Sequence, residues 1–467
     1  MSYALHLLEA FSTGKRRPLR ILGASGQLGY GIVASSFANG MAQRPDMIGC
    51  DMGSTDIGPN YLGSGKMAPS RSGVKRDLRQ VLTAARKADI PLVIGSAGSA
   101  GAKPHLEATL DILREVAREE GLSFTLAVLT GDIAAARVHR ALAAGEITAM
   151  AGMNPLKAED IDSASHIVAQ MGMEAFARAY LSGADVIIAG RACDTAIFAS
   201  LPVLLGFDAG PAIHMAKIIE CASLCCVPGG RDTILATLDD EGFTLESMAP
   251  ERAATPTSVA AHALYEQADP NEIAEPAGRV DLSQVRYETL DARRCRVSGA
   301  RFIPTAKPRI KLEGASFLGY RAVMLAGVAD PNFIAALDAI LAGIEKMVAG
   351  LVCAEGQAPD YRLHFHRYGI DGVTPAPPEA PLPREMFLLT ECLAPTQERA
   401  AEVIRSLRQY LLHYGFPGRT STAGNLAFPF TPPELDAGPT YRFSLYHLMD
   451  APDQAQLFPV EIERIGA

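Results

Sequence analysis

The sequence has neither an excess of positive charge nor a long apolar run, and both absences limit what it can bind. Its 467 residues carry 43 Lys and Arg against 52 Asp and Glu, a formal net charge of −9. This balance supplies no general attraction for nucleic acid or an anionic membrane surface, although a local basic site stays open. We therefore expect neither nucleic acid nor a membrane as a partner.

The longest stretch without a charged residue, residues 21–43, is too polar to cross a membrane. Its 23 residues include five glycines and six Ser, Gln or Asn residues, whereas a transmembrane helix needs about 20 mostly apolar ones. At the N-terminus the apolar part precedes the basic Gly-Lys-Arg-Arg segment, which is the opposite order to a secretory signal. These features predict a cytoplasmic protein.

Paired cysteine motifs are missing as well. None of the eight cysteines forms a Cys-x-x-Cys pair, and several lie in apolar runs such as residues 218–227, which predicts reduced, buried thiols. His364 and His366 would share one face of a strand, but no carboxylate near them in the sequence completes a metal-binding set. We therefore expect no metal site, and whether these two histidines are functional stays open.

Strand-like and helical patterns alternate through the first 210 residues. Uniformly apolar strands separated by amphipathic helices are typical of a parallel sheet covered on both faces. We therefore predict an α/β protein with a doubly wound, mostly parallel sheet. The expected strands are 19–22, 47–51, 91–95, 124–129 and 185–189, and the clearest helical windows are 75–87 and 104–120.

The pattern changes after residue 210. A helix over 214–226, a hairpin over 233–248 and strands over 294–303 and 309–325 are expected, followed by strands over 386–393 and 441–449 and a helix over 396–412. Composition divides the chain into an α/β domain (1–210), a mixed continuation (211–375) and a small C-terminal α+β unit (376–467).

The first loop of the expected sheet carries glycines at 23, 26 and 29. A glycine-rich turn between strand and helix lets the backbone approach a phosphate, and Asp51 lies where a ribose-binding carboxylate would follow. Gly23, Gly26 and Gly29 are therefore weak candidates for binding a nicotinamide cofactor. The sequence has no Tyr-x-x-x-Lys pair for hydride transfer, so we expect no cofactor, and NAD(P) binding is the minority alternative.

Two further loops follow strands and carry groups suited to a ligand. The fifteen residues 51–65, which start at the last residue of the second strand, hold two carboxylates and three Ser or Thr hydroxyls, and loops of this length that stay ordered are often functional. Because ligands of open α/β sheets bind at the carboxyl ends of the strands, these loops predict one pocket. From them we predict catalytic roles for Asp51 and Asp56 and substrate binding by Ser54, Thr55, Ser96, Ser99 and Lys103.

Arg191 and Asp194 follow the last apolar strand of this region. An arginine faces the unfavourable end of the next helix dipole, so a bidentate clamp on a substrate carboxylate is one interpretation, with Asp194 in the same binding set. A purely structural Arg191–Asp194 ion pair is the other. Farther along, helical spacing makes Lys217 a neighbour of His214 and of Glu220, and these three are further catalytic candidates for proton transfer.

Together these motifs resemble the acyclic terpene utilisation AtuA-like family from about Leu19 to Leu448. The segments that carry the resemblance are G-S-T-D-I-G-P-N-Y-L-G-S-G, I-G-S-A-G-S-A-G-A-K-P-H-L, A-D-V-I-I-A-G-R-A-C-D-T-A-I-F-A, H-M-A-K-I-I-E-C, I-K-L-E-G-A and G-N-L-A-F-P-F-T-P. The resemblance implies the catabolism of branched terpenoid acids handled as CoA thioesters, with lyase or hydratase activity. His364 and His366, just before R-Y-G-I-D-G-V-T-P, depart from the expected pattern and leave a subgroup-specific function open.

We therefore expect an enzyme with lyase or hydratase chemistry on a branched carboxylic acid or its acyl-CoA thioester. Asp51, Asp56 or Lys217 would transfer the proton, and loop N–H groups would stabilise an enolate. An NAD(P)-dependent oxidoreductase and a non-catalytic ligand-binding or partner subunit are the alternatives. We also expect a homo-oligomer, with a small partner protein as an open addition.

Overall fold

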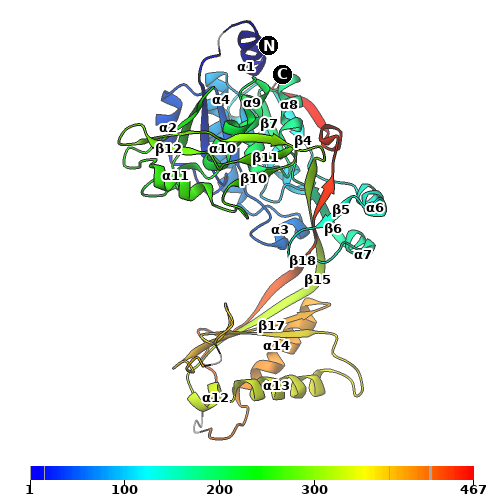
Figure 1. Ribbon diagram of the computed structural model, residues 1–467. Coiled ribbons are helices and arrows are strands. Elements are labelled where there is room, and N and C mark those ends of the chain that lie inside the picture. The colour runs from blue at the N-terminus through cyan, green and yellow to red at the C-terminus, as the bar shows by residue number, and fades with distance from the viewer. Residues whose placement is uncertain (1, 15, 378, 420–422, 467) are drawn as a thin grey trace. The chain divides into compact units, whose positions relative to one another are not determined.

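The computed structural model describes residues 2–14, 16–377, 379–419 and 423–466 (Figure 1). Its contacts divide the chain into two compact units: unit 1 comprises residues 1–316 and 443–467, and unit 2 comprises residues 317–442. The chain passes from one unit to the other within two long strands, β15 (Arg309–Val328) and β18 (Glu434–Asp450). The boundaries expected from composition, at 210 and 375, fall inside these units.

A ten-stranded mixed sheet forms the centre of unit 1, in the order β12-β13-β9-β8-β1-β2-β3-β7-β4-β19. Its middle part consists of the neighbouring strands β1, β2, β3, β7 and β4, which are all parallel. They are the five strands expected from the sequence. The strands are β1 (Leu19–Ser25), β2 (Met47–Asp51), β3 (Leu92–Gly95), β7 (Val186–Ala189), β4 (Phe124–Leu129), β8 (Ile234–Asp239), β9 (Gly242–Ser247), β12 (Arg286–Thr289), β13 (Arg294–Ser298) and β19 (Val460–Ile465).

The protein is therefore α/β as expected, but its sheet is mixed and is not the doubly wound, mostly parallel sheet expected from the sequence. On the side of β1 where a second parallel half would begin, the β8–β9 hairpin pairs antiparallel instead. At the other edge β19, from the end of the chain, pairs antiparallel with β4. Alternating strands and helices predict the parallel middle, but not which distant strands extend it.

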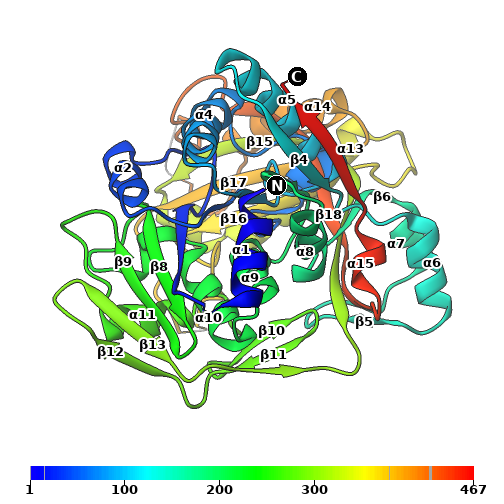
Figure 2. The ribbon, with the colours of Figure 1, turned by 90° about the horizontal axis from the view of Figure 1, so that it is seen from above.

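Helices cover both faces of this sheet (Figure 2). The amphipathic α4 (Arg71–Ala88) and α5 (Lys103–Glu119) pack on one face, while α8 (Met173–Leu181), α9 (Asp194–Leu204) and α10 (Ala209–Ile219) pack on the other. The helix expected over 214–226 ends at Ile219, because the chain turns through Ala222, whose φ is 55°, into the short 3₁₀ segment η1 (Ala222–Cys225).

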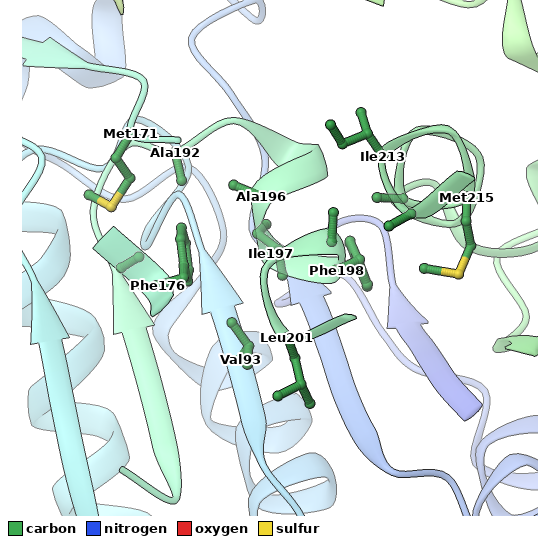
Figure 3. Packing of buried hydrophobic residues seen from close by; sticks show 14 of the residues in the cluster. Val93, Met171, Phe176, Ala192, Ala196, Ile197, Phe198, Leu201, Ile213 and Met215 are labelled. Carbon is green, nitrogen blue, oxygen red and sulfur yellow. The ribbon is translucent and has the colours of Figure 1, made fainter. Parts of the chain in front are cut away.

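Helix α9 lies unusually close to the sheet, and glycines in the strands allow it. A Cβ added at Gly49 would lie 2.3 Å from the Phe198 ring, and one at Gly95 would lie 2.4 Å from Ile197 Cδ1. Figure 3 shows Ile197 and Phe198 packed over the strands beside Leu201. This packing fixes the start of α9, and with it Asp194, at the carboxyl end of the parallel strands.

The remaining elements of unit 1 surround this sheet. A three-stranded sheet is formed by β10 (Glu272–Glu275), β11 (Gly278–Asp281) and β14 (Arg301–Pro304), while β6 (Ala164–Ala169) pairs with β15 and β5 (Ile147–Ala149) with β18. The helices are α1 (Tyr3–Thr13), α2 (Ala34–Ala42), α3 (Pro59–Ser64), α6 (Ala135–Ala143), α7 (Ala158–Asp162), α11 (Pro256–Ala263) and α15 (Gln454–Leu457).

Unit 2 is a smaller α+β assembly over residues 317–442, and it overlaps only part of the C-terminal α+β unit, 376–467, expected from the sequence. Strands β16 (Arg362–Tyr368) and β17 (Met386–Ala394) pair antiparallel with β15, and helices α13 (Leu337–Val352) and α14 (Gln397–Leu412) enclose an apolar core against them. The short α12 (Pro331–Ala335) precedes α13. In the described parts of both units, none of the helices combines the length and the apolarity that a membrane span requires.

Candidate active site

A cavity of about 210 Å³ lies in unit 1 at the carboxyl ends of β1 and β2. Loops that are far apart in the sequence form its wall: the loops after β1, β2 and β7, the end of α10, and the segment that follows α11. Five carboxylates line it, from Asp51, Asp56, Asp194, Glu220 and Glu266, together with the guanidinium of Arg231. Of the loops predicted to converge, the one after β3 contributes no lining residue.

Asp51 is the last residue of β2. It is more buried than Asp56, the other acid that this loop contributes to the cavity. Asp51 is 7 % exposed, and its Oδ2 accepts a hydrogen bond from Gly53 N–H at 2.9 Å, while its buried Oδ1 has no hydrogen-bond partner among the described residues. Burial, and then the nearby charge of Asp194, raise the pKa of Asp51 well above its usual value. Asp56 is exposed and accepts a hydrogen bond from Ser54 Oγ at 2.7 Å.

Lys217 and Glu220 form a buried ion pair at the end of α10, at the spacing that the sequence predicts to bring them together. Lys217 Nζ also lies 3.5 Å from Glu266 Oε2. Burial raises the pKa of Glu220 well above its usual value, against the opposing effect of Lys217. Burial alone would lower the pKa of Lys217, but the Glu220 carboxylate keeps it above its usual value, so the lysine remains an ammonium.

Arg191 is buried, and its guanidinium fork is already occupied. Its Nε and Nη2 atoms donate to Glu313 Oε2 and Oε1 at 2.7 and 3.2 Å, and Nη1 donates to Ser96 Oγ at 3.2 Å. Asp194 is more distant, with its Oδ1 3.8 Å from Nη1. The bidentate partner is therefore a carboxylate of β15 that neither interpretation of the sequence named, and the fork is not free for a ligand.

The other predicted substrate-binding residues lie away from the cavity wall, except Ser54. Thr55 is buried. Ser99 Oγ donates a hydrogen bond to the Ser54 carbonyl at 2.9 Å, so Ser99 stabilises the loop after β2. Lys103 is exposed beside Glu107. Whether any of them contacts a substrate stays a prediction.

The glycine-rich first loop is occupied by a carboxylate of the protein itself. Gly29 N–H and Gly31 N–H both donate to Asp77 Oδ2, at 2.8 and 2.9 Å, and Asp77 is fully buried on α4. Gly26 lines the cavity, whereas a Cβ at Gly23 would meet the Ile219 carbonyl at 2.9 Å. Two of the donors that a phosphate would need are therefore already bound.

His214 lies apart from the cavity. It is fully buried against Phe243 and Tyr287, whose hydroxyl lies 3.3 Å from Nε2. Burial lowers the pKa of His214 to about 3. A neutral imidazole in this apolar setting packs the helix, and of the expected set only Lys217 and Glu220 meet.

In unit 2, His364 and His366 share one strand face as predicted, with ring centroids 4.4 Å apart. No carboxylate directly flanks them in the sequence, but the fold brings one from another strand. Glu391 stands opposite His364 on β17, and its Oε2 lies 3.6 Å from His366 Nε2. Cross-strand pairing brought this residue into place, and spacing along the sequence gave no sign of it.

Three residues of the site region were missed by sequence reasoning. Glu266 reaches the cavity from the turn after α11, where its φ is 58°. Arg231 lines the cavity from an exposed loop, and no ion pair joins it to another described residue. Glu313 neutralises Arg191. Glu313 lies in the I-K-L-E-G-A segment that supports the family resemblance, but nothing in that segment indicated its contact with Arg191.

Comparison with known families identifies one that covers most of the chain. The model of the family described as acyclic terpene utilisation family protein AtuA matches residues 19–431. Neither the curated proteins nor the solved structures gave a match. Since the match spans most of the chain and includes the residues of the cavity, the chain belongs to the AtuA family of acyclic terpene utilisation.

Proposed function

We propose that this protein is an enzyme of acyclic terpene utilisation that performs lyase- or hydratase-type chemistry on a small branched carboxylic acid or the acyl end of its CoA thioester. One observation carries the proposal: Asp51, a buried carboxyl with a raised pKa and an unpaired oxygen, faces a cavity lined by four other carboxylates. Buried acids with shifted pKa values at a cavity are typical of proton-transfer sites.

The size of the cavity favours a small acyl group. A volume of about 210 Å³ lies below the range of about 300–1,000 Å³ for pockets that enclose a drug-sized ligand, and it suits a short branched acyl chain better than a complete CoA. A thioester would therefore place its nucleotide outside. Arg231, at the exposed side of the wall, is the cation available to a carboxylate or phosphate of the substrate.

The proposed reaction uses two carboxyl groups in different environments. Asp56, which is exposed, removes a proton from the carbon next to the carbonyl, and the electron pair of that C–H bond forms the new double bond. The C–O bond on the adjacent carbon breaks, and Asp51, whose pKa is raised by burial, acts as the acid and donates a proton so that the hydroxyl leaves as water. Lys217 holds Glu220 and Glu266 in place beside them. Hydration is the reverse of these steps.

The direct test is proton exchange at the substrate carbon. The purified protein is incubated in D₂O with a set of short branched acids and their CoA thioesters, and mass spectrometry follows deuterium uptake. We expect uptake next to the carbonyl, together with gain or loss of water, for at least one member of the set. A protein that binds such an acid but exchanges no proton would instead favour a ligand-binding role.

Replacing Arg231 with glutamine should weaken the use of an anionic substrate. Because the guanidinium is the one cation among the described residues of the cavity wall, we expect kcat/KM to fall roughly tenfold or more, about 1.4 kcal/mol, with little change in thermal stability. Arg286→Gln is the matched control, since it removes the same charge from the exposed β12. Equal kinetics for the two variants would contradict the role of Arg231.

A further inference from the structure

Asp194, Glu220 and Glu266 form a cluster that we call the carboxylate triad. Each contributes one oxygen, and the three oxygens lie within 4.8 Å of one another. They come from three separate segments: the first turn of α9, the residue after α10 and the turn after α11. Nothing in the local sequence pattern brings them together, so the fold alone creates this concentration of negative charge.

Buried oxygens without partners accompany the triad. Glu220 is 3 % exposed, and its Oε2 has no hydrogen-bond partner in the described part of the chain. The same is true of Oδ1 of Asp51, which lies outside the triad but lines the same cavity. Leaving a buried acceptor unpaired is costly, most of all for a charged group, so such oxygens usually face an ion, a water molecule or a ligand.

Lys217 is the nearest cation to the triad, but it does not pair with all of the triad's oxygens. It pairs with Glu220 through Oε1, which leaves Oε2 of the same carboxylate open, and its contact with Glu266 is longer, at 3.5 Å. Two cations, Lys217 and Arg231, accompany the five acidic side chains of the cavity. The guanidinium of Arg191, 3.8 Å from Asp194, is itself paired with Glu313. The arrangement allows Glu220 to hold the lysine with one oxygen and a cation with the other.

We propose that the carboxylate triad binds one divalent cation of the hard class, Mg²⁺ or Mn²⁺, at the edge of the cavity. Three carboxylates without sulfur or imidazole ligands match the oxygen preference of these ions. Protein ligands on one side leave the remaining coordination positions facing the cavity, where water or a substrate oxygen can complete them. In the reaction the cation would polarise the substrate carbonyl, and this role rests on the proposed function. Binding of the cation to the triad does not depend on the proposed function.

Mn²⁺ is the probe for this site, because its electron paramagnetic resonance signal falls when the ion is bound. Protein treated with a chelator and then freed of it is titrated with MnCl₂ in the absence of substrate. Glu266→Gln is the informative variant, since Glu266 is the most exposed member of the triad, with a side chain 43 % exposed, and its replacement should not prevent folding. Glu251→Gln removes the same charge from an exposed position that is not on the cavity wall.

We expect one Mn²⁺ per chain, an affinity at least tenfold weaker in Glu266→Gln and an unchanged affinity in Glu251→Gln. The thermal midpoint of the unaltered protein should also rise with MnCl₂, as it does for any ligand that binds only the folded state. No binding at millimolar Mn²⁺, or equal binding by Glu266→Gln, would overturn the proposal.

The two proposals fail separately. Deuterium uptake by protein that binds no Mn²⁺ would leave the proposed function standing and remove the cation site. Tight, triad-dependent Mn²⁺ binding without deuterium uptake from any acid, with the ion present, would do the reverse.

Discussion

Replacing Glu313 with glutamine should lower the free energy of unfolding by about 3–5 kcal/mol, the range measured when one partner of a buried ion pair is removed. Glu313 is fully buried and faces two cations: Arg191, through two hydrogen bonds, and Lys311, whose Nζ lies 2.9 Å from Oε1. A neutral amide would leave the buried Arg191 guanidinium with only the more distant carboxylate of Asp194, 3.8 Å from Nη1, as a counter-charge. Chemical denaturation monitored by circular dichroism measures the loss.

The pH dependence of this loss follows from the pKa of Glu313. Burial would raise that pKa, but Arg191 and Lys311 together hold it at about 2, against a usual value of 4.5. The charged form therefore stabilises the fold fully above pH 4.5, and this contribution disappears as the pH falls toward 2. The difference between Glu313 and its glutamine variant should shrink over that range.

A surface acid serves as the control for Glu313. Glu115 pairs with Lys75 and Arg71, and all three side chains are partly open to water. Exposed pairs of this kind add little to stability, so Glu115→Gln should change unfolding far less than Glu313→Gln. Similar losses for the two variants would mean that the buried network does not stabilise unit 1.

Replacing Asp51 with asparagine should reduce kcat by roughly 10²–10⁴-fold, the usual contribution of a general acid or base. The side chain keeps its shape, and an amide oxygen can still accept the hydrogen bond from Gly53 N–H. What is lost is the ability to exchange a proton with the substrate. The deuterium-uptake assay measures the change, with the folded fraction of the variant determined beside it.

The free energy of unfolding of Asp51→Asn should not fall along with kcat. Because burial and Asp194 raise the pKa of Asp51 above its usual 3.8, the folded state holds the proton more tightly than the unfolded state does. Ionisation of Asp51 therefore costs stability as the pH rises above 3.8, and asparagine avoids that cost. We expect the variant to be at least as stable as the natural protein at neutral pH.

Asp77 is another buried aspartate of unit 1, and its replacement is the control for the stability of Asp51→Asn. Its carboxylate accepts hydrogen bonds from Gly29 N–H, Gly31 N–H and Arg76 Nε. Hydrogen bonds to charged groups contribute about 1.5–3 kcal/mol each, so Asp77→Asn should destabilise the protein. If Asp51→Asn also destabilised it and kept its activity per folded molecule, Asp51 would be a structural residue and not the acid.

Local patterns predicted much of what positions the candidate site. The five parallel strands, helices α4 and α5 and the β8–β9 hairpin lie where periodicity and turn residues place them, and the resemblance to the AtuA family is confirmed by the match over residues 19–431. The rule that ligands bind at the carboxyl ends of parallel strands directed attention to Asp51, Asp56 and Asp194, and all three line the cavity. These features depend on short-range spacing, which a sequence displays directly.

The sequence by itself thus determined the parallel α/β centre, the family and the loops that carry acidic residues. Only the tertiary structure decided which groups those loops meet: Glu313 on Arg191, Asp77 on the glycine-rich loop, and Glu266 beside Glu220. These partners are brought in by β15, α4 and the turn after α11. A carboxylate can bind any nearby donor, and which donor is near depends on how distant segments pack, so no local pattern contains that information.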